Sequence, residues 1–183
     1  MSKTRDLEAR LERAEQQVRL FQRVSRLMTR DMGLEGVLSE IVNLVRDFLD
    51  TDSCLIYLVE ENELVLYASS DQGQQNIGRV RLRLNEGLTG WVARERRLLA
   101  ISREAYSDPR FKYFKDLPQD SFEAFLSVPI IAQSKVVGVI NVQHREPRIH
   151  SGGDMEMLST LGEQIGCLLV LSRLKVPAAS LVR

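Results

Sequence analysis

Two glycines three residues apart, Gly87 and Gly90, mark the part of the sequence best suited to hold a ligand. They lie in residues 85–93, which read Asn-Glu-Gly-Leu-Thr-Gly-Trp-Val-Ala. Gly87 suits a turn with positive φ, and Gly90 lets a short helix approach a sheet. The free N–H groups at the start of such a helix can hold an anionic or carbonyl-bearing ligand, although most helix N-termini are simply hydrated. Because the segment has no catalytic group, it predicts the wall of a binding pocket.

The histidines and cysteines do not indicate a metal centre. His144 and His150 are six residues apart in a polar stretch, and Cys54 and Cys167 are remote in sequence. A zinc site needs several such ligands brought together. We therefore expect exposed loop histidines and no metal. Each cysteine lies in an apolar stretch, which in a reducing compartment suits a small buried hydrophobe better than a disulfide.

The signatures of common enzyme classes are absent. The sequence contains no GxxxxGK[ST], no GxGxxG after a strand and no GxSxG, so the phosphate cradle and the nucleophile elbow lack their key residues. No Ser–His–Asp grouping is obvious, although sequence alone leaves a spatial cluster open. A binding domain without catalytic residues explains the chain with fewer assumptions, and no cofactor is identified.

A stretch rich in aromatic residues follows the short helix. Residues 102–122 have no clear periodicity and contain Asp-Pro and Leu-Pro turn pairs. A connection of this length inside a compact domain is usually functional, often as a lid. Anchoring of the loop to the domain body is an equally weighted alternative for any single ring. The rings are those of Tyr106, Phe111, Tyr113, Phe114 and Phe122.

The elements that must position this pocket follow from periodicity. Amphipathic spacing predicts helices, and β-branched or alternating runs predict strands. Arginines alternate with apolar residues over 79–84, which favours a solvated strand face over a basic groove. The result is an α+β fold, with helices packed on a central antiparallel sheet. The expected helices are 34–48, 88–96 and 154–174, and the expected strands are 53–59, 63–69, 79–84, 98–101, 124–131 and 135–144.

The N-terminal helix carries an apolar stripe at spacings of four and three, typical of a coiled-coil seam of about two heptads. Together with apolar positions of the last helix, it predicts a parallel homodimer in which the terminal helices form a four-helix bundle. The alternative is that the last helix covers the stripe within one chain. The predicted interface residues are Leu7, Leu11, Ala14, Val18, Phe21, Leu161, Ile165 and Leu168.

Length and composition suit one domain with an accessory helix. The 183 residues are 44% hydrophobic, and 25 basic residues balance 25 acidic ones, so no global field attracts nucleic acid or an anionic membrane. The first residues are too charged for a signal peptide, and no apolar run approaches the ~18 residues of a membrane span. We expect a cytoplasmic protein, with a coiled-coil extension over 1–19, one domain over 20–176 and a tail over 177–183.

Several ordered blocks of the sequence resemble the GAF family of small sensory domains. They are residues 85–93, Phe-Leu-Ser-Val-Pro-Ile at 125–130 and Val-Val-Gly-Val-Ile-Asn-Val at 136–142. The run Asp-Pro-Arg-Phe-Lys-Tyr-Phe at 108–114 is most similar to the bacterial GAF modules of nitrogen-type phosphotransferase enzyme I and the nitrogen-fixation activators. The resemblance spans about residues 20–174.

The resemblance implies a pocket between the sheet, the short helix and the lid. Residues 141–146 depart from the Asn-Lys motif of cyclic-nucleotide-binding relatives. Residues 85–125 contain no cysteine of the kind that bilin-binding and methionine-sulfoxide-reducing relatives use. The ligand residues carried over by position are Trp91, Tyr106, Phe111, Phe114, Ser127 and Asn141.

The sequence thus favours a sensory domain that binds an unidentified small molecule under the lid. It would signal through the homodimeric bundle to a downstream effector protein or domain. Two alternatives stay open. One is a structural dimerisation module whose pocket is filled by its own side chains, and the other is a small redox enzyme of the methionine-sulfoxide reductase type.

Overall fold

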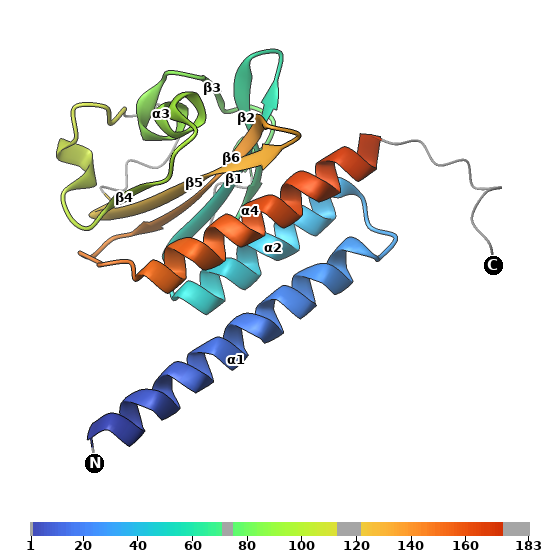
Figure 1. Ribbon diagram of the computed structural model, residues 1–183. Coiled ribbons are helices and arrows are strands. Elements are labelled where there is room, and N and C mark those ends of the chain that lie inside the picture. Colours follow the sequence, from blue (N-terminus) through green and yellow to red (C-terminus); the bar gives the residue numbers. More distant parts are fainter. Residues whose placement is uncertain (1, 71–74, 113–121, 174–183) are drawn as a thin grey trace, which may run out of the picture.

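The computed structural model describes residues 2–70, 75–112 and 122–173, with side chains from residue 4. These residues fold into one antiparallel sheet, with α2 and α4 on one face and α3 on the other (Figure 1). The helices are α1 (Ser2–Met28), α2 (Leu34–Leu49), α3 (Gly87–Glu95), α4 (Gly152–Arg173) and the short 3-10 helix η2 (Ala105–Ser107). The strands are β1 (Ser53–Glu60), β2 (Glu63–Ser69), β3 (Arg81–Arg83), β4 (Leu99–Ile101), β5 (Ala124–Ala132) and β6 (Lys135–His144).

The strands lie in the order β3-β2-β1-β6-β5-β4, and every neighbouring pair is antiparallel. Both long hairpins close through two residues with positive φ, Glu61-Asn62 and Gln133-Ser134. This is the backbone of a type I′ turn, whose twist matches that of the strands. Pro129 of β5 lies beyond the residues that pair with β4, so its missing N–H falls at a free edge. The predicted α+β fold is confirmed.

The strand expected over 79–84 is shorter than predicted. The amides of Arg79 and Val80 donate to the Asn76 carbonyl at 3.0 and 3.1 Å, which closes a tight turn before β3. Only three residues then pair with β2. The side chains of Arg79, Arg81 and Arg83 are exposed, as the alternation predicts.

The largest core cluster fills the layer between the sheet and helices α2 and α4. Leu161 and Ile165 of α4 belong to it and are 0% exposed within the single chain. They are therefore unavailable to a second copy, and this corrects their prediction as interface residues. Leu168 is half-buried at the edge of the same cluster.

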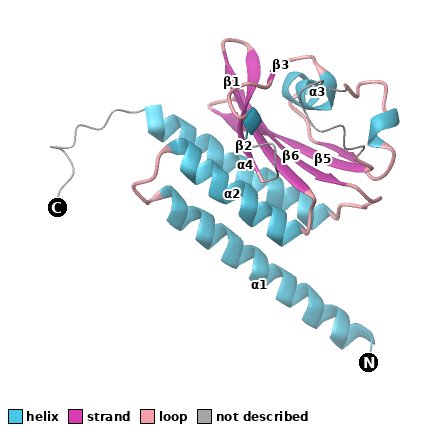
Figure 2. Cartoon of the chain, turned by 180° about the vertical axis from the view of Figure 1, so that it is seen from behind, coloured by secondary structure: helices cyan, strands magenta, loops and turns pink. Residues whose placement is uncertain are grey.

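Helix α1 joins this layer only through its second half. Leu20, Val24 and Leu27 are buried against the core, whereas Leu7, Leu11 and Val18 are 62%, 63% and 53% exposed. Ala14 is exposed too, and Phe21 is half-buried. Figure 2 shows α1 running beside α2, with its N-terminal part projecting past the body. Most of the apolar stripe thus stays uncovered by the described residues of its own chain.

One arginine fixes the point where α1 leaves the body. The Arg13 guanidinium lies 4.0 Å from the centroid of the Phe48 ring on α2 and donates to the Phe48 carbonyl at 3.3 Å. It also contacts the Asp154 carboxylate in the first turn of α4 at 2.8 Å. Gln17 adds a hydrogen bond to the Gly153 carbonyl at 3.1 Å. Arg13 therefore links α1 to both helices beneath the sheet.

Helix α4 packs directly on the backbone of β5. A Cβ placed on Gly166 would lie 2.6 Å from the Ile131 carbonyl oxygen, closer than real Cβ contacts. A Cβ on Gly162 would lie 3.3 Å from the Pro129 carbonyl oxygen. Small residues at these positions let the helix axis approach the strand.

The two histidines form a buried pair where β6 leads into α4. Their ring centroids are 5.1 Å apart, and the side chains of His144 and His150 are only 5% and 6% exposed. This corrects the expectation of exposed loop histidines. Arg148, between the two histidines, donates its amide to the Ser102 carbonyl at 2.9 Å, which ties the connecting segment to the residue after β4.

Burial lowers the pKa of both histidines, and that of His150 falls to about 4. Beyond burial, the neighbouring His144 and Arg148 lower the pKa of His150, whereas the Asp154 carboxylate raises it. Neither Nε2 atom has a hydrogen-bond partner among the described residues. Both rings are therefore neutral at pH 7. The two cysteines differ in burial. Cys54 is buried as predicted, whereas Cys167 is exposed on α4, which corrects the expectation that both are buried.

We predict that Gly166→Ala lowers the free energy of unfolding by about 1–3 kcal/mol, because the new methyl group meets a backbone carbonyl that cannot rotate away. The gain in helix propensity, about 1 kcal/mol, offsets only part of this loss. Gly153→Ala on the same helix is the control, since its nearest atom is a side-chain oxygen at 3.7 Å. Urea unfolding measures both variants, and equal effects would contradict the close approach of α4 to β5.

We predict an acid-sensitive stability that originates at His150. Below the unfolded pKa of about 6.5 the unfolded chain takes up a proton that the native ring refuses until about pH 4, so acidification favours unfolding. The loss across this window is about 3 kcal/mol at 1.36 kcal/mol per pKa unit. Wild type and His150→Phe are compared by urea unfolding between these pH values. If the free energy of unfolding falls equally in both proteins as the pH is lowered, groups other than His150 cause the acid sensitivity.

Candidate functional site

The site on the α3 face is built on the glycine turn before α3. Gly87 has φ of +67°, and a Cβ on Gly90 would lie 2.6 Å from the Arg83 carbonyl oxygen. The Glu86 side chain accepts a hydrogen bond from the Arg83 amide at 2.9 Å and provides no cap to the helix. Both glycine predictions are confirmed, and the turn holds α3 close against the sheet.

A chain of three polar side chains lies buried beneath α3. The Ser127 hydroxyl donates to Asn141 Oδ1 at 2.6 Å, and Asn141 Nδ2 donates to Thr89 Oγ1 at 2.7 Å. Ser127 on β5 and Asn141 on β6 face each other in register, and Thr89 comes from α3. All three are almost fully buried. The structure thus brings together two of the predicted ligand residues and adds a third, Thr89.

This network keeps unused donor capacity. An Asn amide has two N–H protons, and only one of those on Asn141 is used among the described residues. The Thr89 hydroxyl accepts from Asn141, so its own proton is available to an acceptor. The arrangement can therefore donate hydrogen bonds to a carbonyl, carboxylate or hydroxyl oxygen placed beside α3.

An arginine lies over the single tryptophan. The Arg110 guanidinium is 4.5 Å from the centroid of the half-buried Trp91 ring, a cation–π arrangement. Asp108 holds that guanidinium through two hydrogen bonds, 2.8 Å to Oδ1 and 2.6 Å to Oδ2. Arg110 in turn lowers the pKa of the Asp108 carboxyl. Lys112 pairs with Glu86 at the start of α3, so residues 108–112 are tied to that helix.

The structure describes some of the aromatic residues of the predicted lid. Phe111 is half-buried against Leu88, Ala105 and Phe125 and so contributes to anchoring the segment. Tyr106 is half-buried in η2. Phe114 and Tyr113 lie outside the described residues. The structure therefore supports an anchoring contact for Phe111.

Sequence reasoning missed Thr89 and Arg110. Thr89 stands beside Leu88 on the inward side of α3, and a polar side chain between two inward apolar positions was the available signal. Arg110 follows Asp108 by two residues across a proline, a spacing that favours a local carboxylate–guanidinium pair. Its placement over Trp91 depends on how residues 105–112 fold back, which no local pattern encodes.

The described ranges contain neither a metal-binding cluster nor a helix suited to cross a membrane. No group of three or more His, Cys, Asp or Glu side chains there is arranged to hold a metal ion. No helix among these residues combines the length and the hydropathy needed to cross a membrane.

Comparison with known proteins places this architecture in a family. The sequence pattern of the GAF domain matches residues 33–169. The phosphoenolpyruvate-dependent phosphotransferase system protein of Escherichia coli is 34% identical over 143 residues, which cover 75% of this chain and 19% of that protein. The Nif-specific regulatory protein of Azospirillum brasilense is 26% identical over 157 residues, which cover 82% of this chain and 25% of that protein.

A solved structure agrees with these matches. The GAF domain of an Acinetobacter phosphoenolpyruvate-protein phosphotransferase superposes with a TM-score of 0.76 at 28% identity, covering 85% of this chain and 94% of that domain. This chain spans about a fifth of the length of the phosphotransferase system protein that it matches. The glycine turn, the six-stranded order and the helices on both faces all fall within the matched region, and the chain belongs to the GAF domain family.

Proposed function

We propose that this chain is a cytoplasmic sensory domain that binds a small molecule between the sheet, α3 and the segment after β4. The observation that carries the proposal is the buried Ser127–Asn141–Thr89 network with its unused donors. Burying polar side chains costs free energy unless they are hydrogen-bonded. If this layer served only to pack α3 on the sheet, apolar side chains would do so without that cost. The similarity to GAF domains of regulatory proteins supports a sensory role over a catalytic one.

The chemistry of the site favours a ligand with oxygen acceptors and a nonpolar or aromatic part. Thr89 and Asn141 offer donors, and Trp91, two residues after Thr89 on α3, adds a half-buried aromatic ring that packs on the apolar cluster of this face. The Arg110 guanidinium lies over that ring and is paired with Asp108 through Nε and Nη2, so it offers its remaining Nη1 group to a polar ligand oxygen. A small carboxylate-bearing or carbonyl-bearing metabolite fits both features.

The second candidate is a structural dimerisation module. Phe111 packs into the cluster around Leu88 and Phe125, and the side chains of the polar network bond to one another. Side chains of the protein therefore occupy part of the space that a ligand would need. The redox alternative has less support. Cys54 lies in the core between the sheet and helices α2 and α4, whereas Cys167 is exposed on α4.

The output route of the proposed sensor is a parallel homodimer built on α1. Leu7, Leu11, Ala14 and Val18 remain exposed at coiled-coil spacing. Leu171 of α4 is 60% exposed and adds an apolar position on the neighbouring helix. A second copy pairing along α1 would bury these residues and connect the sensor to an effector protein or domain.

We predict that a fraction of a cell-metabolite extract raises the melting temperature of the wild type. At about 100 times Kd a ligand adds about 2.7 kcal/mol, or about 5–10 °C for a chain of this size. Thr89→Val should lose most of this shift, because the hydroxyl is gone, whereas Thr89→Ser should keep it. Native mass spectrometry of freshly purified protein identifies the bound mass. If no fraction shifts the wild type and no small molecule co-purifies, the dimerisation module is the better description.

We predict a dimer in light scattering, with twice the chain mass of 20.9 kDa. Leu11→Glu should convert it to a monomer without unfolding it, since Leu11 is 63% exposed and packs on little of its own chain. Glu12→Gln changes an exposed neighbour and serves as the control. If the wild type is a monomer at micromolar concentration, or if Leu11→Glu remains a dimer, the proposed dimerisation through α1 is wrong.

A further inference from the structure

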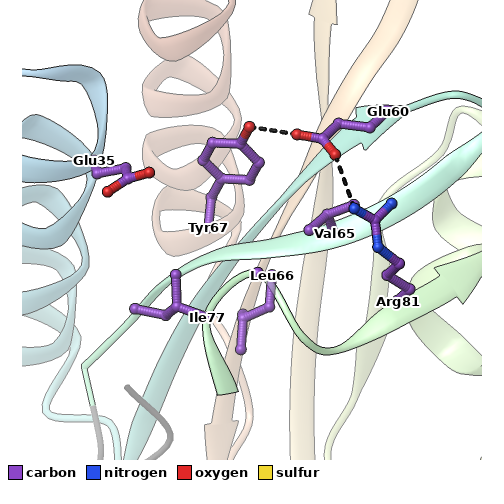
Figure 3. Close-up of a pocket in the computed structure, with 8 residues that line it drawn as sticks. Glu35, Glu60, Val65, Leu66, Tyr67, Ile77 and Arg81 are labelled. Carbon is purple, nitrogen blue, oxygen red and sulfur yellow. Dashed lines mark hydrogen bonds and ion pairs between the residues drawn. The ribbon is translucent and has the colours of Figure 1, made fainter. Parts of the chain in front are cut away.

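A pocket of about 140 Å³ opens at the edge of the sheet where β2 and β3 meet the first turn of α2 (Figure 3). None of the predicted ligand residues within the described ranges lines it. Its helical wall comes from α2, on the other face of the sheet from α3, and Thr89, Ser127 and Asn141 do not line it. Leu66 and Ile77 of its lining also belong to the apolar cluster on the α3 face. Its lining contains the aliphatic residues Val65, Leu66 and Ile77 and the polar residues Glu35, Glu60, Tyr67 and Arg81.

The polar residues of the lining carry an excess of negative charge. Arg81 contacts Glu60 Oε2 at 3.2 Å and Glu63 Oε2 at 3.5 Å, so its one positive charge is shared by two carboxylates. The Tyr67 hydroxyl donates to the other oxygen of Glu60, as Figure 3 shows. Arg81 is therefore already occupied, and the pocket offers no free cation to an anionic ligand among the described residues.

Glu35, in the first turn of α2, is the second carboxylate of the lining beside Glu60, whereas Glu63 lies outside the lining. Its side chain extends toward the Tyr67 ring in Figure 3, and it forms no ion pair with the described residues. The hydrogen bond to Glu60, burial, and the negative charges of Glu60 and Glu35 raise the pKa of Tyr67, which agrees with a negative local potential. The complementary ligand is a cation.

The size of the pocket and its aliphatic residues restrict that cation. A cavity of about 150 Å³ holds benzene, so this pocket accommodates about six non-hydrogen atoms. Val65, Leu66 and Ile77 suit a short hydrocarbon portion rather than a hydrated metal ion. A carboxylate has about four acceptor positions, so Glu60 can accept a further hydrogen bond beside those from Tyr67 and Arg81. The phenol ring of Tyr67 also borders the cationic end.

We propose that this pocket is a second ligand site, which takes a small organic ammonium ion. The ammonium group lies beside the Tyr67 ring and donates to the Glu60 carboxylate, with the charge of Glu35 on the other side of that ring, and the hydrocarbon portion lies against Val65 and Ile77. Because Glu35 belongs to the first turn of α2, the charge of the bound ion acts on both the sheet edge and the helix that directly follows α1. This site does not depend on the proposed ligand of the α3 face.

The test is an amide chemical-shift titration of the 15N-labelled full chain at pH 7 with n-butylammonium. 1-Butanol and butanoate are the matched neutral and anionic probes. We expect saturable millimolar binding of n-butylammonium with shifts at Tyr67, Ile77 and Gly78, about tenfold weaker binding of 1-butanol and no binding of butanoate. Equal binding of n-butylammonium and 1-butanol, or no saturable shift with n-butylammonium, would overturn the proposal.

Variants on α2 locate the charge. Glu35→Gln should weaken n-butylammonium about fivefold while leaving 1-butanol unchanged. Glu40→Gln, an exposed carboxylate of the same helix outside the pocket, should bind as the wild type does. Both positions are exposed, so the fold is retained and the spectra report this directly. If both variants bind n-butylammonium with wild-type affinity, Glu35 is no part of the site and the proposal fails.

Discussion

The close approach of backbone to backbone at a few glycines is the constraint on which the rest of this fold depends. Gly166 brings α4 against the Ile131 carbonyl on one face, and Gly90 brings α3 against the Arg83 carbonyl on the other. Gly138 has the same role within the sheet, since a Cβ there would lie 2.4 Å from the Tyr57 carbonyl oxygen. Any side chain at these points would separate the layers. The positions of α3 and α4, and hence of the site on the α3 face, follow from them.

This approach explains why three polar side chains can be buried beneath α3. With α3 held near the sheet, the Thr89 hydroxyl comes within hydrogen-bond distance of Asn141, and Asn141 reaches Ser127 across the β5–β6 pair. If α3 were further from the sheet, water or an unpaired amide would replace these bonds, at a cost of about 1–3 kcal/mol for an unsatisfied group. The glycine turn and the polar network therefore stabilise each other.

Periodicity and runs of β-branched residues predicted the elements well where the connecting turns are short. The β1–β2 and β5–β6 hairpins, α2 and α4 agree with the expected ranges within a few residues. The family resemblance assigned Ser127 and Asn141 to the pocket, and the predicted hairpin of β5 and β6 puts their strands side by side. Contacts between residues of different elements, which depend on how the connecting segments fold back, were not predicted. The His144–His150 pair forms where the chain turns back between β6 and α4, and the pocket lined by Glu35, Glu60 and Tyr67 forms where α2 begins beside β2. Neither arrangement follows from the spacing of residues within one element.

The β5–β6 pair connects the two faces of the molecule. Along it, Ser127 and Asn141 point to α3, whereas their neighbours Val128 and Ile140 belong to the core beneath α4. Adjacent strand residues face opposite sides, so a ligand that moves Asn141 acts on a backbone that also carries Ile140. The strand β6 ends at His144, beside the segment that leads to Asp154 and its ion pair with Arg13 of α1. Displacement at the α3 site thus has a short covalent and packed route to the contact that fixes α1. A single sheet with helices on both faces is sufficient for such a route.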